Sequence, residues 1–441
     1  MTTQPFIEKN FYIDLVKITR TDGKVENLDQ GSVIQLEYRE GLFNKFISVT
    51  LVISDTTSGI TDELTGMEKV ELKFTDRSNK ISYDFTQNST NGPLYAYRIH
   101  NRKVVDTAKI VAIELCRLDA INSMQIRVCK KYEKVKATGL IGDIIVNVLG
   151  SKKTITAEDS TNKISFIPPN SRPLDVLIWA RNKFIGNAQS PRGKYKSAGY
   201  LFYENYNRYV YQSVDKIAEA NNVEYKQVYV TGTGIGGTDD IYRFENIEFV
   251  SNIDMIENFD RGFYSGIIDF FDIVNCSVTT KKYSLNELYS GWTKINLKNK
   301  KLPSTQNEAT EENLKEGSLE QIAAVESQYA TRSMTVSYNR DLFLGSTDDA
   351  DQDRSEFENT VLQSVSRLGI FTNQVLTATA NVGNMALNIG DPIRIEFYSP
   401  SGKIDKKYSG RYLISGLTHL YTRKEEKYQT FFTLIRDSFG L

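Results

Sequence analysis

VELKF, at residues 70–74, decides the fold class, because its side chains alternate between apolar and charged types. Successive side chains of a β-strand point to opposite faces of the sheet, so this alternation predicts a strand with one apolar face. The three apolar side chains are expected to enter a core. Glu71 and Lys73 are expected to face solvent or a polar channel.

Similar short runs lie on both sides of this stretch, separated by turns that contain Gly, Asp and Asn. They are FYIDLVKI (11–18), SVIQLEY (32–38), KFISVTLVIS (45–54), KISYDF (80–85), LYAYRIH (94–100), KIVAIELC (109–116) and MQIRVC (124–129). Several short strands with turn signals between them are typical of an antiparallel barrel. Residues 1–134 are therefore predicted to form a first β-barrel domain, closed or nearly closed.

The size and composition of the chain favour a β-rich protein of more than one domain. It has 441 residues, and at about 150 residues per domain this gives roughly three domains. The 25 Tyr and 22 Phe, against 9 Pro and 2 Trp, favour strands. With 54 basic and 55 acidic side chains the net charge is -1, which excludes a basic field over the whole protein for nucleic acid or an anionic membrane.

Cysteine and histidine are too few and too scattered for most metal or catalytic sites. The three cysteines, Cys116, Cys129 and Cys276, form no CxxC pair, and we expect them to be small buried side chains of a protein in a reducing compartment. His100 and His419 are the only histidines, so no HExxH motif exists. We therefore predict no catalytic residues, no metal site and no cofactor.

The hydrophobic period changes after the first barrel, which predicts a compact α+β domain over residues 135–232. Apolar residues form one stripe over 139–149, and Thr138 is a candidate N-cap for a helix there. A second apolar stripe over 171–185, with Pro173 in its first turn, predicts a second helix. Aromatic strand-like segments follow both helices.

Strand patterns return in the second half of the chain. Residues 233–296 are predicted to be strands that join a second barrel, and the polar stretch 297–332 is predicted to be a linker or a mobile loop. In 333–441, Ser355 and Glu358 form a possible capping box for a helix, and further strands complete the second barrel. The predicted fold class is mainly β, with two antiparallel β-barrel domains and an α+β insertion between them.

Three stretches look like ligand or catalytic motifs, and each fails a test of context. The GxGxxG pattern at 232–237 follows a strand but precedes no helix, so it lacks the helix N-terminus that holds a pyrophosphate. The aspartates of 349–353 have the opening spacing of a calcium loop, but Arg354 and Thr360 stand where Gly and Glu are needed. GFYSG at 262–266 lacks the strand-turn-helix context of a nucleophile elbow.

One segment mixes aromatic and basic side chains. Its members are Tyr195, Tyr200, Phe202, Tyr203, Tyr206, Tyr209 and Tyr211, with Arg192, Lys194, Lys196 and Arg208. Such a mixture occurs in stacking platforms for single-stranded nucleic acid, in protein interfaces and on ordinary exposed sheet surfaces. The sequence leaves these three interpretations open.

The C-terminal strands resemble a known family. NIGDPIRIEF (388–397), GRYLISGLTHLY (410–421) and KYQTFFTLIRD (427–437) are similar to the closing strands of baseplate hub proteins from contractile-tailed phages and of the related spike proteins of type VI secretion. EGLFNKFISVTLVISDT (40–56) and GMEKVELKF (66–74) look like the opening barrel of those hubs. The resemblance covers most of the chain in order and is strongest near the C-terminus.

The resemblance implies a non-enzymatic structural protein of the virion, located in the tail baseplate and made in the host cytoplasm. Hubs of this family are homotrimers in which two tube barrels per chain build a ring with pseudo-six-fold symmetry. The ring connects the tail tube, or a tube-initiator protein, to the central spike protein, contacts baseplate wedge proteins and lets DNA pass without sequence-specific binding. Glu71 and Lys73 are candidates for the bore or for the outer surface.

Two alternatives remain from the sequence. The chain could be another tail or secretion-system spike component of the same barrel type, or a β-rich tail enzyme that acts on glycans. No uninterrupted apolar run approaches the ~18 residues that a membrane-spanning helix needs, so we expect a soluble chain that does not insert into a membrane.

Overall fold

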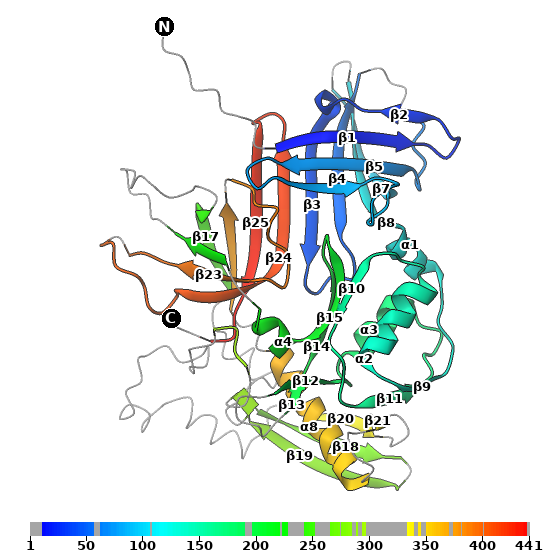
Figure 1. Cartoon of the computed structure of the whole chain (residues 1–441), viewed down its shortest axis with the longest axis vertical. Helices are drawn as coiled ribbons and strands as arrows, with labels where there is room; N and C mark the ends of the chain where they lie inside the picture. The colour runs from blue at the N-terminus through cyan, green and yellow to red at the C-terminus, as the bar shows by residue number, and fades with distance from the viewer. Residues whose placement is uncertain are drawn as a thin grey trace.

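The computed structural model shows a mostly β protein with a helix-containing region at one side (Figure 1). It describes residues 11–56, 62–105, 108–189, 196–220, 223–227, 242–251, 265–273, 275–284, 288–289, 293–296, 333–338, 343–344, 350–369, 374–380, 382–399 and 401–438. The predicted fold class, mainly β with an α+β insertion, is confirmed.

The N-terminal β region consists of antiparallel strands that surround one apolar core. The strands are β1 (Phe11–Thr19), β2 (Val25–Asn27), β3 (Val33–Gly41), β4 (Ser48–Asp55), β5 (Lys69–Asp76), β6 (Ile81–Phe85), β7 (Leu94–Val105) and β8 (Ala108–Arg117), with a 3-10 turn at Gln30–Ser32. As the alternation in VELKF predicts, Val70, Leu72 and Phe74 are fully buried. Glu71 is also buried, contrary to expectation, because its carboxylate accepts a hydrogen bond from Lys17 Nζ at 2.9 Å.

The middle α+β region packs short helices against small sheets. Its elements are α1 (Leu118–Gln125), β9 (Tyr132–Val135), α2 (Ala137–Gly142), a π-helical turn (Asp143–Val148), β10 (Thr154–Ala157), β11 (Lys163–Phe166), α3 (Pro173–Ala180), β12 (Ile185–Gln189), β13 (Lys196–Ala198), β14 (Tyr200–Glu204), β15 (Arg208–Ser213) and α4 (Val214–Ala218). Both predicted helices exist, but their details differ from the prediction. The segment MQIRVC (124–129) was predicted to be a strand, but Met124 and Gln125 are the last residues of α1 and the segment forms no strand.

The first helix begins at Ala137, and Lys136 is its N-cap. Thr138 lies inside the helix and donates from Oγ1 to Asp159 at 2.8 Å, so it does not cap the helix. The second helix keeps its proline at the first position but ends at Ala180. Ile185 belongs to strand β12, where the apolar spacing of a buried strand happened to continue the helical stripe.

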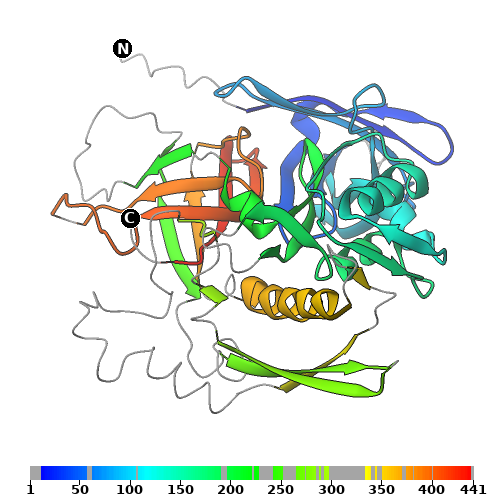
Figure 2. The ribbon, with the colours of Figure 1, turned by 60° about the horizontal axis from the view of Figure 1, so that its bottom comes forward.

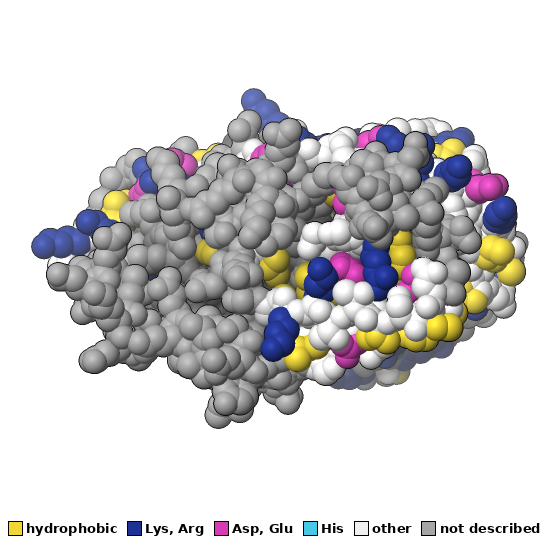
Figure 3. All heavy atoms as spheres, turned by 90° about the horizontal axis from the view of Figure 1, so that it is seen from below, with side chains coloured by type: hydrophobic (Ala, Val, Ile, Leu, Met, Phe, Trp, Pro, Cys, Tyr) yellow, Lys and Arg dark blue, Asp and Glu magenta, His cyan; other side chains and the backbone are white. Residues whose placement is uncertain are grey.

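A separate three-stranded sheet carries the long helix of the second half. It contains β18 (Ser265–Asp272), β19 (Ser277–Ser284) and β20 (Ser333–Tyr338), while the two-residue β21 (Phe343–Leu344) pairs with β11. Helix α8 (Ala350–Gly369) lies between this sheet and the rest of the molecule (Figure 2). Figure 3 shows hydrophobic side chains along one rim of the face seen from below.

The predicted capping box at Ser355 is wrong, because α8 begins five residues earlier. Glu358 is buried against β19 and binds Arg354 at 3.2 Å and Lys281 at 3.4 Å, so its carboxylate joins helix to sheet instead of reaching back to a helix start.

The C-terminal β region continues the N-terminal sheet instead of forming a separate one. Its strands are β16 (Val223–Lys226), β17 (Asn246–Ser251), β22 (Val375–Ala380), β23 (Pro392–Glu396), β24 (Gly410–Thr422) and β25 (Lys427–Ile435). Strand β24 pairs antiparallel with β3, from Gly416 opposite Gly41 to Thr422 opposite Gln35. Eight strands thereby form one antiparallel row in the order β7-β8-β4-β3-β24-β25-β22-β17, which we call the strand row.

The strand pairing divides the range 233–296, which was predicted to join the second barrel. Strand β17 joins the C-terminal β region by pairing with β22. Strand β18 instead pairs with β19 on one side and with β20 on the other, in the separate sheet. The motif at 232–237, the segment 297–332, residues 262–264 and Asp349 lie outside the described residues.

Candidate functional site

The most unusual chemistry in the described part of the chain is a group of buried charges where the three regions meet. We call it the junction cluster: Glu40 near the end of β3, Arg117 at the end of β8, Asp119 in α1, Lys153 before β10 and Glu204 at the end of β14. All five side chains are buried. Charges this far from water are tolerated only when they are paired and hydrogen-bonded, so the contacts of each group matter.

Glu204 is the centre of the cluster. Its Oε1 accepts from Lys153 Nζ at 2.8 Å and from Arg117 Nη1 at 3.1 Å, and its Oε2 accepts from the backbone N–H of Ile47 at 3.1 Å. Burial raises the pKa of the Glu204 carboxyl, but the two cations and the hydrogen bonds outweigh burial and hold that pKa below its usual value. Glu204 is therefore ionised at neutral pH.

The remaining charges complete a compensated network. Arg117 Nη2 lies 3.1 Å from Asp119 Oδ2, which also accepts hydrogen bonds from Ser151 at 2.7 Å and from Tyr209 at 3.0 Å. Burial lowers the pKa of Lys153 to about 8, against the opposing pull of Glu204. The network connects β8 and α1 to the small sheet that contains β14 and β15. It therefore fixes the orientation of the N-terminal β region relative to the middle α+β region.

Glu40 joins all three regions with one carboxylate. Its Oε1 accepts from the hydroxyl of Tyr38 and from the backbone N–H of Tyr206, both at 2.6 Å, and its Oε2 accepts from the backbone N–H of Ile389 at 3.2 Å. Tyr206 belongs to the middle region and Ile389 to the C-terminal region. Burial raises the pKa of Glu40 to about 7, although these hydrogen bonds oppose the shift.

The raised pKa of Glu40 predicts a pH dependence of stability. The folded state holds the Glu40 proton up to about pH 7, while the unfolded state loses it near 4.5, so stability falls as pH rises through this window. At about 1.4 kcal/mol per pKa unit, the loss is about 3 kcal/mol. Relative to the unmodified chain, Glu40→Gln should therefore gain stability as pH rises from 5 to 7, measured by urea unfolding of both chains from pH 5 to 8.

Glu37→Gln is the matched control, because Glu37 lies on the same strand, faces outward and binds Arg39 at 2.6 Å. It should keep the pH dependence of the unmodified chain. A Glu40→Gln variant whose stability has the same pH dependence as the unmodified chain would show that Glu40 does not contribute to it.

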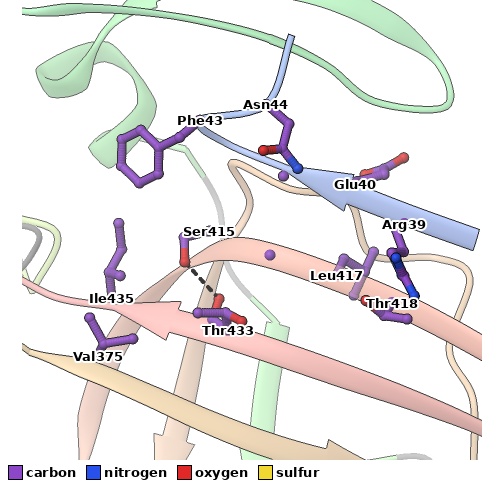
Figure 4. Close-up of a pocket in the computed structure, with 12 residues that line it drawn as sticks. Arg39, Glu40, Phe43, Asn44, Val375, Ser415, Leu417, Thr418, Thr433 and Ile435 are labelled. Carbon is purple, nitrogen blue, oxygen red and sulfur yellow. Dashed lines mark hydrogen bonds between the residues drawn. The ribbon is translucent and has the colours of Figure 1, made fainter. Parts of the chain in front are cut away.

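A pocket of about 420 Å³ lies at the seam between β3 and β24. Phe43 and Asn44 project over it from the segment after β3, and Val375 and Ile435 form the opposite wall (Figure 4). Its floor includes Ser415, whose hydroxyl donates to the backbone oxygen of Thr433 at 3.0 Å. The lining is apolar at one end and polar at the other, and it lacks the paired acid and base that hydrolysis of a glycan requires.

The outer face of the strand row mixes small polar, charged and apolar side chains, and Val375, Leu420 and Phe431 lie on it among the hydroxyl groups. Hydroxyl groups on this face come from Ser48, Thr50, Ser54, Thr377, Thr379, Thr418, Thr422 and Thr433, all of which are half-buried. Two of its acidic residues have basic neighbours: Glu37 binds Arg39, and Glu114 lies 3.1 Å from His100 and 3.5 Å from Arg98. The face runs without interruption across both β regions, because β3 and β24 are paired.

The structure decides against the surface interpretations of the aromatic segment. Tyr200, Phe202, Tyr203, Tyr209 and Tyr211 are buried in the core of the middle region, because both faces of β14 and β15 are covered. They form neither a stacking platform nor an exposed sheet. Arg192, Lys194 and Tyr195 lie outside the described residues.

The cysteines and histidines lie apart from one another. Cys116 is buried as expected, but Cys129 and Cys276 are exposed, so the expectation of burial was wrong for these two. His419 is buried in the core, and His100 is partly exposed on β7. Among the described residues no three His, Cys, Asp or Glu side chains form a possible metal site, and none of the described helices is long and apolar enough to cross a membrane.

Comparison with solved structures relates this fold to phage tails. The chain is similar to a tail protein from Neisseria meningitidis MC58, with 10% identity, a TM-score of 0.55 and coverage of 97% of this chain and 96% of that chain. It is similar to the 43 kDa tail protein of prophage MuSo2 from Shewanella oneidensis, with 7% identity, a TM-score of 0.50 and coverage of 96% and 98%. The chain has the fold of these tail proteins. The resemblance to the tail-hub family is thus confirmed at the level of fold.

A component of the type VI secretion system of E. coli is more distant, at 9% identity and a TM-score of 0.41 over 98% of this chain and 78% of that chain. No family model and no curated protein sequence matches the chain.

Proposed function

We propose that the chain is a structural baseplate hub of a contractile phage tail. Three copies form a ring that connects the tail tube or its initiator to the central spike, contacts the baseplate wedges and lets DNA pass. The observation that carries this proposal is the strand row, in which four strands from each β region form one antiparallel sheet. Each chain contributes two four-stranded halves of the strand row, so three chains contribute six. A ring of this kind suits an adapter between a six-fold tail tube and a three-fold spike.

The outer face of the strand row supports a role as the wall of the bore. DNA is held by Lys and Arg side chains that neutralise its phosphates, and each such contact strengthens binding. Hydroxyl groups on this face carry no charge that neutralises phosphates, and Arg39 and Arg98 lie beside Glu37 and Glu114, so part of the basic charge of this face is already compensated. We assign the bore to this face in place of Glu71 and Lys73, because β5, which carries them, lies outside the strand row.

The purified chain tests this proposal by its mass and shape in solution. A trimer of three 50.1 kDa chains has a mass of about 150 kDa, and negative-stain images should show rings with an axial hole. A chain that is monomeric, alone and with its spike partner, would contradict the hub and leave the alternative of another tail component with the same fold.

A further inference from the structure

At each end of the strand row, all or part of the outermost strand pairs with no further described strand. At one end, β17 pairs only with β22. At the other end, β7 pairs with β5 at Leu94 and Tyr95, and Ala96 exchanges backbone hydrogen bonds with Met67 and Glu68. From Arg98 to Val105 the only described strand that pairs with β7 is β8. The two edges lie on opposite sides of the molecule (Figure 1). Open strand edges expose unpaired N–H and C=O groups and are a frequent cause of association with another chain.

The β17 edge is apolar and acidic. Phe249 and Val250 are 40% and 59% exposed, although large apolar side chains usually avoid water. The carboxylates of Glu245 and Glu248 lie on the same edge and are also exposed. The edge thus combines an apolar surface with negative charge.

The β7 edge is apolar and basic. Val104 and Val105 are 71% and 50% exposed. Arg98, Arg102 and Lys103 are exposed on the same stretch. The two edges of the strand row therefore carry opposite charges and similar exposed apolar side chains.

We propose that the β17 edge of one copy pairs antiparallel with the β7 edge of a second copy. This inference rests on the proposed hub function and names the surfaces that would close its ring. The strand directions allow this pairing. All seven pairs of adjacent strands in the row are antiparallel, so the direction alternates along the eight strands, and the first strand, β7, runs opposite to the last, β17. A β7 strand placed beside β17 in the same orientation of the molecule continues the alternation.

Such a contact is head-to-tail, because it joins two different surfaces. An open chain of copies therefore has a free β17 edge at one end and a free β7 edge at the other. Only a closed ring leaves no edge free. Opposite charge across the contact favours this partner over a pairing of two identical edges, in which like charges would meet.

Crosslinking tests the pairing directly. Val104→Cys and Val250→Cys are placed together in one chain in which Cys129→Ser and Cys276→Ser remove the exposed native thiols. A short bismaleimide should then give covalent dimers and trimers on denaturing gels. Chains with only one of the two new cysteines are the controls and should stay uncrosslinked, since each contact needs both edges.

The outcomes separate this inference from the hub proposal. A chain of trimeric mass that gives no crosslink with both cysteines would overturn the edge pairing and leave the hub intact. Crosslinked dimers from either single-cysteine chain would also overturn it, because they indicate pairing of identical edges. A chain that is monomeric in mass and uncrosslinked, both alone and with its spike partner, would overturn both proposals together.

Charge reversal gives an independent measurement. Glu248→Lys and Lys103→Glu should each weaken trimer formation by roughly tenfold or more, because like charges then face each other at every contact. The chain with both substitutions restores opposite charges and should regain most of the association. Loss without recovery in the double variant would contradict the pairing.

Discussion

Replacing Glu204 by Gln is expected to lower the free energy of unfolding by about 3–5 kcal/mol, because it leaves buried cations without their partner. Glu204 accepts hydrogen bonds from both Lys153 and Arg117. Gln keeps the shape of the side chain but carries no charge, so Asp119 alone would have to balance two cations. Urea unfolding at pH 7.5 and the shift in melting temperature measure the loss.

Glu224→Gln is the matched control for this prediction. Glu224 is exposed and lies 3.5 Å from Arg394, and an exposed pair of this kind contributes at most about 1 kcal/mol. Equal losses for the two variants would show that the junction cluster is not a special source of stability.

A second variant separates lost charge from lost shape. Lys153→Met combined with Glu204→Leu removes one charge of each sign and leaves Arg117 beside Asp119. The pair should be more stable than Glu204→Gln alone, because no buried cation then lacks a partner. A double variant that is less stable than the single one would contradict the electrostatic explanation.

Short-range sequence patterns, such as the alternation of a strand and the apolar spacing of a helix, predicted most of the individual strands and helices. In VELKF the two-residue period alone placed three side chains in the core, because strand geometry fixes which side chains share a face. The same reasoning missed Glu71, whose burial depends on Lys17 of a neighbouring strand. It also extended the helix of 171–185 past Ala180, since buried strand residues can match a helical spacing by chance.

Pairings between distant segments could not be predicted in this way. The contact of β3 with β24 joins residues that lie far apart in the chain, and a two-residue period says nothing about which strand lies alongside. The junction cluster also depends on contacts between distant segments, so short-range patterns could not predict it. Glu40 and Glu204 are two among 55 acidic residues, and only the folded arrangement brings them to the backbone and cations of other regions.

The proposed hub function assigns different contributions to the buried junction and to the strand row. A ring that transmits force between tube and spike needs regions of fixed orientation within each copy. Paired buried charges are costly to separate, and Glu40 and Glu204 hold three regions together. The proposed contacts between copies use the edges of the strand row instead. Rigidity within a chain and association between chains therefore depend on different residues and can be altered separately.

His419→Gln is expected to remove the steepest part of the acid unfolding of this protein. The His419 ring is buried, and its Nδ1 lies 3.0 Å from both Thr430 Oγ1 and the hydroxyl of Tyr428. Burial lowers the pKa of His419 from 6.5 to about 3. Between these values the unfolded chain binds a proton that the folded chain does not, so stability is lost as pH falls through this window. The loss amounts to about 5 kcal/mol at about 1.4 kcal/mol per pKa unit.

Urea unfolding at several values from pH 7.5 to 4 measures this effect, and His100→Gln is the matched control at a partly exposed position. Glu40 works in the opposite direction, because its protonated form is favoured in the folded state. Its contribution rises as pH falls from about 7 to 4.5, which offsets most of the loss from His419 over that range, so the unmodified chain loses stability mainly below about pH 4.5. With the histidine gone, stability should therefore increase between pH 7.5 and 5. A His419→Gln variant whose stability has the same pH dependence as that of His100→Gln from pH 7.5 to 4 would show that His419 does not control the acid limit of the fold.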